Sequence, residues 1–155
     1  MSESLTLNLP DEAATRDLAA RLAGAARPGD VLLLSGPVGA GKTAFARAFI
    51  RARLRSPGTE VPSPTFTLVQ TYDDGKAEIW HADLYRLSHP DEALELGLGD
   101  AFETAICLVE WPDRLGSLAP EDALHLHLSA DADGVHRVRV APGARWAPLI
   151  GPEAA

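Results

Sequence analysis

The sequence predicts a single α/β domain whose sheet mixes parallel and antiparallel strands. Three observations support this fold class. A short apolar run at 31–34 precedes helix-forming residues at 44–50, and hairpin patterns occupy residues 65–84 and 124–140. The 155 residues are enough for one domain with its own core and too few for two, so we expect one domain over residues 1–155.

The N-terminal part of the chain predicts a strand, a helix and a second strand. Residues 5–9 alternate apolar and polar side chains, as a half-buried strand does. Asp11 is placed to cap the following helix, whose first turn carries Glu12. The apolar run 31–34 is then typical of a buried strand.

The middle of the chain departs from a simple series of parallel strands. Residues 65–72 and 77–84 alternate, and the segment 73–76 between them contains the turn signal Asp-Gly. This antiparallel hairpin is the reason to expect a mixed sheet. The other expected elements are a short helix at 93–98, a central buried strand at 106–109, an irregular segment with a turn of helix at 112–120, hairpin strands at 124–128 and 135–140, and a terminal helix at 144–150.

The segment 35–43 reads Ser-Gly-Pro-Val-Gly-Ala-Gly-Lys-Thr and fits G-x-x-x-x-G-K-[ST] from Gly36 to Thr43. Its glycines let the backbone follow a tight loop, so that successive N–H groups can form an anion nest at a helix start. Lys42 is placed to bridge the β- and γ-phosphates, and the Thr43 hydroxyl to ligate Mg²⁺. With its strand and helix, the loop predicts a P-loop NTPase-like three-layer domain that binds a nucleoside triphosphate and magnesium. The alternative is a glycine turn without a ligand.

Two carboxylates are candidates for the chemistry. Glu110 lies at the end of a predicted central strand, where a Walker B carboxylate holds Mg²⁺ or orients water, although Asp is the usual residue there. Asp83 shares a strand face with His81 and Tyr85, and such a polar row is costly in a core unless it is paired or bound. We interpret Asp83 as a metal-shell or water-positioning residue. The alternatives are a charged strand end for Glu110 and an ion pair with Arg86 for Asp83.

Several other residues have two interpretations. His81 is a structural histidine or a base, and it is not assigned to Mg²⁺, which prefers oxygen ligands. Thr65 is a switch threonine that senses the γ-phosphate, or an ordinary strand threonine. Trp111 either anchors the core or forms part of a surface that changes with the bound nucleotide. The single cysteine, Cys107, is expected in the core, which argues against a disulfide framework and suits a reducing cytoplasm.

Composition and charge restrict the function further. No apolar run is long enough for a membrane span, and the polar N-terminus lacks a signal peptide pattern, so we expect a cytoplasmic protein. The net charge of −8 argues against a chain that grips nucleic acid by itself. Four arginines at 47, 51, 53 and 55 are interpreted as the solvated side of a helix or, alternatively, as a docking surface.

Taken together, the motifs resemble a known family. The segments that carry the resemblance are Gly36 to Thr43, Ser63-Pro64-Thr65-Phe66-Thr67, His81-Ala82-Asp83-Leu84-Tyr85-Arg86-Leu87 and Leu108-Val109-Glu110-Trp111-Pro112. In this order and spacing they resemble the bacterial TsaE family, small ATPases required for the threonylcarbamoyladenosine modification of adenosine 37 in tRNA. The resemblance implies Mg-dependent ATP hydrolysis that supports a complex of the TsaB and TsaD proteins, with tRNA reached only through that complex.

The resemblance also implies roles for individual residues. Thr43 and Glu110 would hold Mg²⁺, with Asp83 near the metal and important for hydrolysis. Glu12 and Thr15 would lie near the base or sugar. The residues that would wrap the phosphates are Gly39, Ala40, Gly41, Lys42, Thr43 and Ala44. Together these assignments make Lys42, Asp83 and Glu110 the catalytic candidates.

Two rival functions remain open on the sequence. A small-molecule kinase would use the same loop with a hydroxyl substrate in place of water, although no clear arginine-rich lid segment is present. A nucleotide-gated binding module would use only the ATP-bound shape, with negligible hydrolysis.

Overall fold

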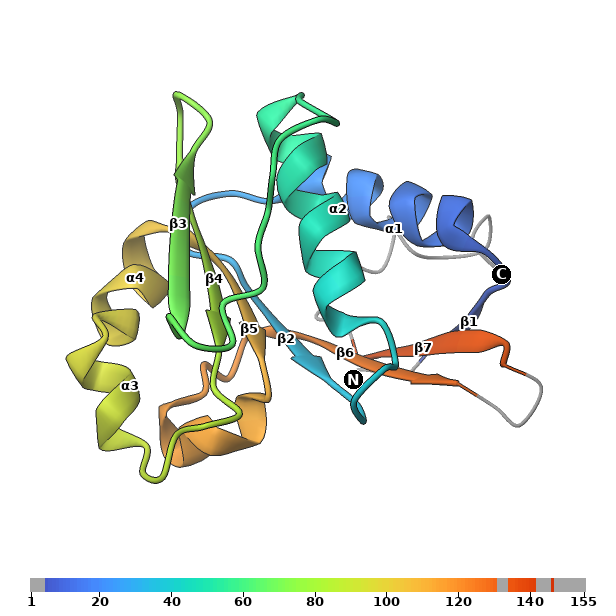
Figure 1. Ribbon diagram of the computed structural model, residues 1–155. Coiled ribbons are helices and arrows are strands. Elements are labelled where there is room, and N and C mark those ends of the chain that lie inside the picture. The colour runs from blue at the N-terminus through green and yellow to red at the C-terminus, as the bar shows by residue number, and fades with distance from the viewer. Residues whose placement is uncertain (1–4, 131–133, 142–145, 147–155) are drawn as a thin grey trace.

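The computed structural model describes residues 5–130, 134–141 and 146 of the chain (Figure 1). In chain order the elements are β1 (Leu5–Leu9), α1 (Glu12–Ala25), β2 (Val31–Ser35), α2 (Lys42–Leu54), β3 (Val69–Asp73), β4 (Glu78–Asp83), α3 (Asp91–Glu95), α4 (Leu98–Thr104), β5 (Ile106–Glu110), the 3-10 helix η1 (Pro112–Leu118), β6 (Leu124–Ala130) and β7 (His136–Ala141). Within this described part, no helix has the length and apolar composition that crossing a membrane requires.

The strands form one seven-stranded mixed sheet in the order β1-β7-β6-β2-β5-β4-β3. Its centre is a parallel block of β6, β2, β5 and β4. The hairpin partner β3 pairs antiparallel at one edge, and β7 and β1 continue the sheet antiparallel at the other. Both predicted hairpins are therefore present, and the predicted mixed sheet is confirmed.

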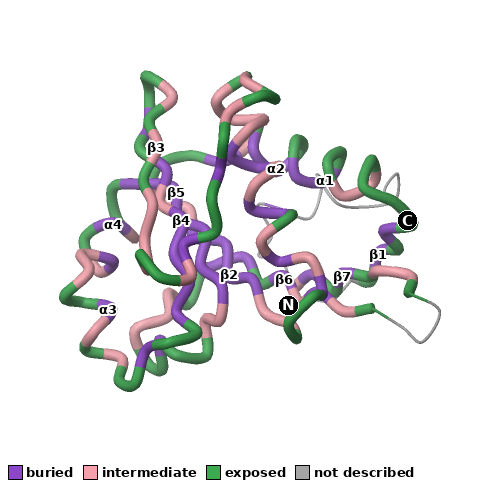
Figure 2. The backbone as a smooth tube through the Cα atoms, in the orientation of Figure 1, coloured by how far each residue is buried: buried purple, intermediate pink, exposed green. Residues whose placement is uncertain are grey.

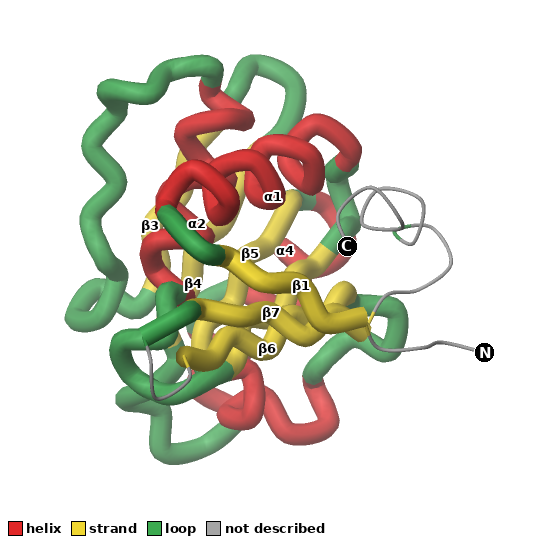
Figure 3. The backbone as a smooth tube through the Cα atoms, turned by 90° about the vertical axis from the view of Figure 1, so that its right-hand side faces the viewer, coloured by secondary structure: helices red, strands yellow, loops and turns green. Residues whose placement is uncertain are grey.

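Helices cover both faces of this sheet because alternate side chains of the central strands enter different cores. On β2, Leu32 and Leu34 pack in the core that contains the buried side chains of α1 and α2. Val31 and Leu33 point the other way, into the core that contains those of α3 and α4. Figures 1 and 3 show α1 and α2 side by side over one face, and Figure 2 shows burial concentrated in β2, β4 and β5. The predicted three-layer α/β architecture is confirmed.

Local signals explain where several elements begin. Asp11 caps α1, as expected, because its side chain accepts a hydrogen bond from the Ala14 amide at 2.9 Å. The apolar run on β2 is buried over Val31 to Leu34, and β5 is buried over its whole length to Glu110. Continuous burial of this kind is typical of parallel strands covered on both sides.

The first predicted hairpin strand starts later than its alternating pattern indicates. Residues 65–67 form a turn, and β3 begins only at Val69. Leu68 has a φ of 70°, which is outside the extended range. Its amide donates to the Pro64 carbonyl at 2.7 Å and closes the turn. The prediction of a strand from residue 65 is therefore wrong.

The short helix predicted at 93–98 is also wrong in extent. The structure has two helices here, of which α3 ends at Glu95 and α4 runs from Leu98 to Thr104. Gly97, inside the predicted helix, has a φ of 90° and is the N-cap of α4, so it separates two helices. The terminal helix predicted at 144–150 lies outside the described residues apart from the buried Trp146.

All three arginines on α2 bind backbone carbonyls, whereas Arg55 is the C-cap that follows the helix. Arg47 donates to Val61 and Arg51 to Thr59, at 3.0 and 2.8 Å, which attaches the segment after α2 to the helix. Arg53 donates to the carbonyls of Ala23 and Ala26, both at 2.8 Å. These side chains hold the fold together, so the interpretation of the cluster as a solvated helix face is wrong for three of its members.

Strand pairing brings the functional candidates together at the carboxyl ends of the central parallel strands. Glu110, at the carboxyl end of β5, lies in register with Leu34 on β2 and with Asp83 on β4. The loop that connects β2 to α2 starts at the same end of these strands. Carboxyl ends of parallel strands beside such a loop are where α/β proteins bind ligands.

Candidate functional site

The loop at residues 36–41 packs tightly against the sheet. Gly36 has a φ of 131°, and a Cβ atom there would lie 2.1 Å from the carbonyl oxygen of Leu128 on β6. Only glycine fits this position without moving β6. Gly41 has a φ of 106° and is the N-cap of α2, so the helix begins at Lys42 with its first amide groups at the loop.

Lys42 is folded back over its own loop. Its ammonium donates hydrogen bonds to the carbonyls of Gly36 at 2.5 Å and Pro37 at 2.9 Å. It also lies 4.3 Å from the centre of the Trp111 ring, a cation–π distance. Burial lowers the pKa of Lys42 from its ordinary value, against the opposing effect of the Glu110 and Asp83 carboxylates.

Glu110 is the most connected carboxylate of the site. It is buried, with 2% of its surface exposed. Its Oε1 accepts a hydrogen bond from the Thr43 hydroxyl at 2.9 Å, and its Oε2 lies 2.6 Å from His81 Nε2. Two side chains from β4 and α2 therefore hold the carboxylate at the end of β5.

Asp83 is held at the end of β4 by weaker contacts. Its Oδ1 accepts from the Tyr85 amide at 3.0 Å, and its Oδ2 accepts from the Thr65 hydroxyl at the longer distance of 3.3 Å. The Arg86 guanidinium lies over the Phe66 ring, 5.1 Å from its centre. The alternative of an Asp83–Arg86 ion pair is therefore not what the structure shows.

One cavity of about 450 Å³ brings these side chains together. The residues that line it are Val38, Gly39, Gly41, Lys42, Thr43, Ala44, Thr65, Asp83, Tyr85, Glu110 and Trp111. All three predicted catalytic residues and all three predicted metal ligands are among them. The predicted switch residue Thr65 lies here too, in a turn rather than on a strand.

The donor set is suitable for magnesium. Thr43 and Glu110 offer oxygen atoms that lie within hydrogen-bonding distance of each other, and Asp83 lines the same cavity. The described residues contain no group of three or more His, Cys, Asp or Glu side chains that could hold a metal. Mg²⁺ usually needs only one or two protein oxygens in addition to phosphates and water.

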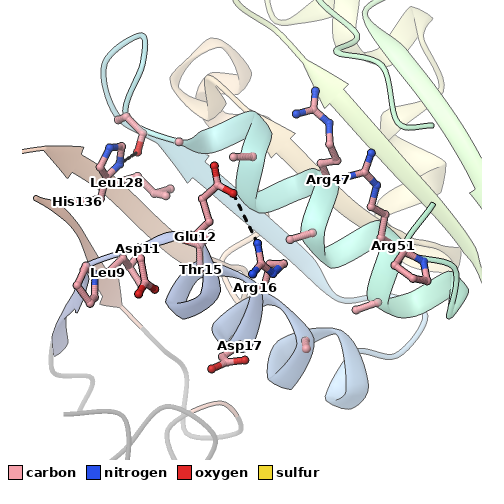
Figure 4. Close-up of a pocket in the computed structure, with 18 of the residues that line it drawn as sticks. Leu9, Asp11, Glu12, Thr15, Arg16, Asp17, Arg47, Arg51, Leu128 and His136 are labelled. Atoms are coloured by element: carbon pink, nitrogen blue, oxygen red, sulfur yellow. Dashed lines mark hydrogen bonds and ion pairs between the residues drawn. The ribbon is translucent and has the colours of Figure 1, made fainter. Parts of the chain in front are cut away.

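A larger cavity of about 840 Å³ lies between α1 and α2, on the side of the loop where β7 begins (Figure 4). Glu12 and Thr15 line it from α1, and Ala40 lines it from the loop. Gly41 and Ala44 line both cavities. The residues predicted to bind nucleotide therefore fall into two groups, one on each side of the loop. Glu12 itself forms an exposed ion pair with Arg16 at 3.6 Å.

Sequence reasoning missed the contribution of β7 to the larger cavity. His136 lines this cavity, and its Nδ1 donates to the Ala40 carbonyl at 3.1 Å, because a carbonyl can only accept (Figure 4). The residue is the first of an ordinary alternating strand, so no motif marks it. His127 on β6 also has a hydrogen-bond partner within the fold, because its Nδ1 lies 2.9 Å from the Ser35 hydroxyl.

The chain is similar to known proteins over most of its length. The family model for threonylcarbamoyl adenosine biosynthesis protein TsaE matches residues 9–138. The tRNA threonylcarbamoyladenosine biosynthesis protein TsaE of Rickettsia conorii is 40% identical over 125 residues, which cover 81% of this chain and 70% of that protein. The Bacillus subtilis protein of the same name is 38% identical, over 80% of this chain and 75% of its own length. A crystal structure of Bacillus subtilis YdiB superposes with a TM-score of 0.78 at 31% identity, over 96% of this chain and 93% of that chain.

Proposed function

Because this chain belongs to the TsaE family, which serves tRNA threonylcarbamoyladenosine biosynthesis, we propose that it is a magnesium-dependent ATPase that acts on the TsaB–TsaD complex during modification of adenosine 37. The observation that carries the nucleotide chemistry is the single cavity lined by Lys42, Thr43, Asp83 and Glu110. Any contact with tRNA is made through the complex, and the protein acts in the cytoplasm.

The phosphates of ATP bind between the loop and the start of α2. The backbone amides at residues 39–44 offer hydrogen bonds to phosphate oxygens, and the helix N-terminus favours their negative charge. Lys42 leaves the carbonyls of Gly36 and Pro37 and donates instead to the β- and γ-phosphates. Exchange of carbonyl partners for anionic ones strengthens each of these hydrogen bonds.

Thr43 and Glu110 are the proposed magnesium ligands. Their oxygen atoms lie 2.9 Å apart and line the phosphate cavity. When bound there, magnesium neutralises charge on the β- and γ-phosphate oxygens. Thr43 offers a hydroxyl lone pair to the metal, and Glu110 offers Oε1 directly or through a water molecule.

Asp83 is the proposed water-positioning residue. Glu110 uses both oxygens in close contacts, at 2.9 and 2.6 Å, whereas Asp83 Oδ2 has only the 3.3 Å contact with Thr65. Asp83 Oδ2 is therefore the freer acceptor in the cavity, and it accepts a hydrogen bond from the attacking water and orients it. Lys42 offsets the negative charge that develops on the transferred phosphoryl group.

The larger cavity is the proposed site of the base and ribose. It adjoins the phosphate cavity through Gly41 and Ala44, so one nucleotide can extend along the loop from one cavity to the other. Glu12 and Thr15 present polar groups from α1 beside it. Its volume of about 840 Å³ is within the range of small-molecule sites.

The test is the release of ADP and phosphate from Mg·ATP by the purified chain, alone and with the TsaB–TsaD pair. We expect slow release by the chain alone, faster release with the partners, and loss of release in Asp83→Asn. This variant keeps the size of Asp83 but removes its charge. Lys76→Ala, at an exposed residue that does not line the cavity, is the control.

Other outcomes would identify a rival function. Formation of ADP without a matching amount of phosphate would indicate transfer onto an acceptor, as in a small-molecule kinase. Nucleotide binding without turnover under either condition would indicate a gated binding module. Either result would overturn the proposed hydrolysis.

A further inference from the structure

His81 is a fully buried histidine beside the proposed magnesium site. It lies on β4, paired with Leu108 of β5, and none of its surface is exposed. Its Nε2 is 2.6 Å from Oε2 of Glu110, the shortest of the side-chain contacts that hold this carboxylate. Because an ionised carboxylate can only accept hydrogen bonds, Nε2 carries the shared proton and donates it.

Only one of the two ring nitrogens of His81 has a hydrogen-bond partner among the described residues. Nδ1 is buried and has no hydrogen-bond partner among the described residues. A buried polar atom without a partner costs free energy that an apolar side chain at the same position would avoid. A purely structural role thus explains this residue poorly. The complete burial of the ring also keeps it from contacting a nucleotide directly.

The contact with His81 determines how Glu110 faces the cavity. The last torsion of a glutamate side chain is broad, so one anchor leaves the carboxylate free to rotate. With Oε2 held by His81, Oε1 is the oxygen left beside the Thr43 hydroxyl, and Glu110 and Thr43 both line the phosphate cavity. Oε2 therefore anchors the carboxylate to His81, and Oε1 remains available at the proposed magnesium site.

We propose that His81 is a positioning residue that holds Glu110 so that Oε1 and Thr43 face the magnesium ion of the bound nucleotide. This inference rests on the proposed function, because it needs magnesium at Thr43 and Glu110. Residues that hydrogen-bond to metal ligands typically change metal affinity by about 10- to 100-fold when they are replaced. His81 acts through Glu110 and touches neither nucleotide nor metal.

Two matched variants separate positioning from packing. The amide nitrogen of Gln in His81→Gln reaches about as far as Nε2, whereas that of Asn in His81→Asn reaches only as far as Nδ1. The measurement is calorimetric titration with the non-hydrolysable analogue adenylyl imidodiphosphate, in excess MgCl₂ and in EDTA. We call the affinity in MgCl₂ divided by the affinity in EDTA the magnesium gain. The midpoint of thermal unfolding is measured for both variants.

We expect the magnesium gain of His81→Asn to fall roughly 10- to 100-fold, with the affinity in EDTA unchanged. His81→Gln should keep most of the gain. The inference is overturned if His81→Asn keeps the wild-type gain, or if both variants lose equal affinity with and without magnesium. A wild-type chain that binds the analogue without any magnesium gain would instead refute the proposed magnesium site, and this inference with it.

Discussion

Lys42 is the residue whose contacts must change most when a nucleotide binds. Its ammonium now contacts two loop carbonyls and the Trp111 ring. We expect Lys42→Ala to weaken Mg·ATP binding by about 2–3 kcal/mol, or roughly 30- to 150-fold, because hydrogen bonds to a charged group are lost. Titration calorimetry measures this. Lys76→Ala replaces the only other lysine, in the exposed β3–β4 turn, and is the control. Near-normal ATPase activity of Lys42→Ala in excess magnesium would contradict the site.

Cys107 contributes a pH-dependent term to stability. Burial in β5 raises the pKa of its thiol to about 12 from 9.0, with a smaller contribution from Glu78. Between these values the unfolded chain loses the thiol proton while the folded chain keeps it, so the free energy of unfolding falls as pH rises. At pH 10 the loss is about 1 kcal/mol.

Urea unfolding at pH 8 and pH 10 measures this term as a difference between two chains. We expect wild type to lose more stability across this interval than Cys107→Ala, by about 1 kcal/mol. Subtraction removes contributions shared by both chains, including that of Lys42. Equal losses in the two chains would show that the thiol is not buried as described.

The junction of β2, the loop and β6 depends on one glycine. We expect Gly36→Ala to destabilise the fold by about 3 kcal/mol, because its Cβ would meet the Leu128 carbonyl at 2.1 Å. Gly24→Ala is the matched control, and we expect it to stabilise the fold. Gly24 is exposed on α1, and a Cβ atom there would have no neighbour within 4 Å, so alanine should add about 0.5–1 kcal/mol. Chemical unfolding of both variants checks this, and similar values for the two would refute the close approach of β6.

Arg53 joins three elements at the end of α2. It donates to the Asp74 carboxylate at 2.7 Å, next to the β3–β4 turn, and to two carbonyls at the end of α1. Arg53→Ala should cost about 2–3 kcal/mol of unfolding free energy, because hydrogen bonds to a largely buried charged group are lost. The exposed neighbour Arg55 provides the control, with an expected effect within about 0.5 kcal/mol for Arg55→Ala. If the two variants unfold alike in urea, this junction contributes little.

The charge of the whole molecule bears on how it meets tRNA. The net charge is −8, and the arginines at 47, 51 and 53 already bind backbone carbonyls. We expect the chain alone to bind tRNA more weakly than about 10 μM at roughly 0.15 M salt, because it repels the phosphate backbone at long range. Fluorescence anisotropy of labelled tRNA measures this, with the TsaB–TsaD complex as the comparison. Micromolar, salt-sensitive binding by the chain alone would show a direct tRNA surface.

Short-range patterns explain which features of the whole molecule the sequence predicts. The loop at 36–43, the cap at Asp11 and the buried strand that ends at Glu110 each depend on residues close together in the chain. The two errors in the bounds of helices and strands come from local signals that fit more than one structure. Leu68 fits an alternating pattern but has a positive φ, and Gly97 lies inside the predicted helix 93–98 but is the N-cap of a second helix.

The sequence by itself determined the α/β class, the phosphate loop and the side chains at the ends of β4 and β5, because periodicity and glycine spacing encode them locally. Only the tertiary structure decided the order of the strands and the partners of each side chain. The contacts of Glu110 with Thr43 and His81, of Gly36 with Leu128 and of His136 with Ala40 join segments far apart in the chain. Strand pairing and helix packing bring those segments together, and no local pattern specifies them.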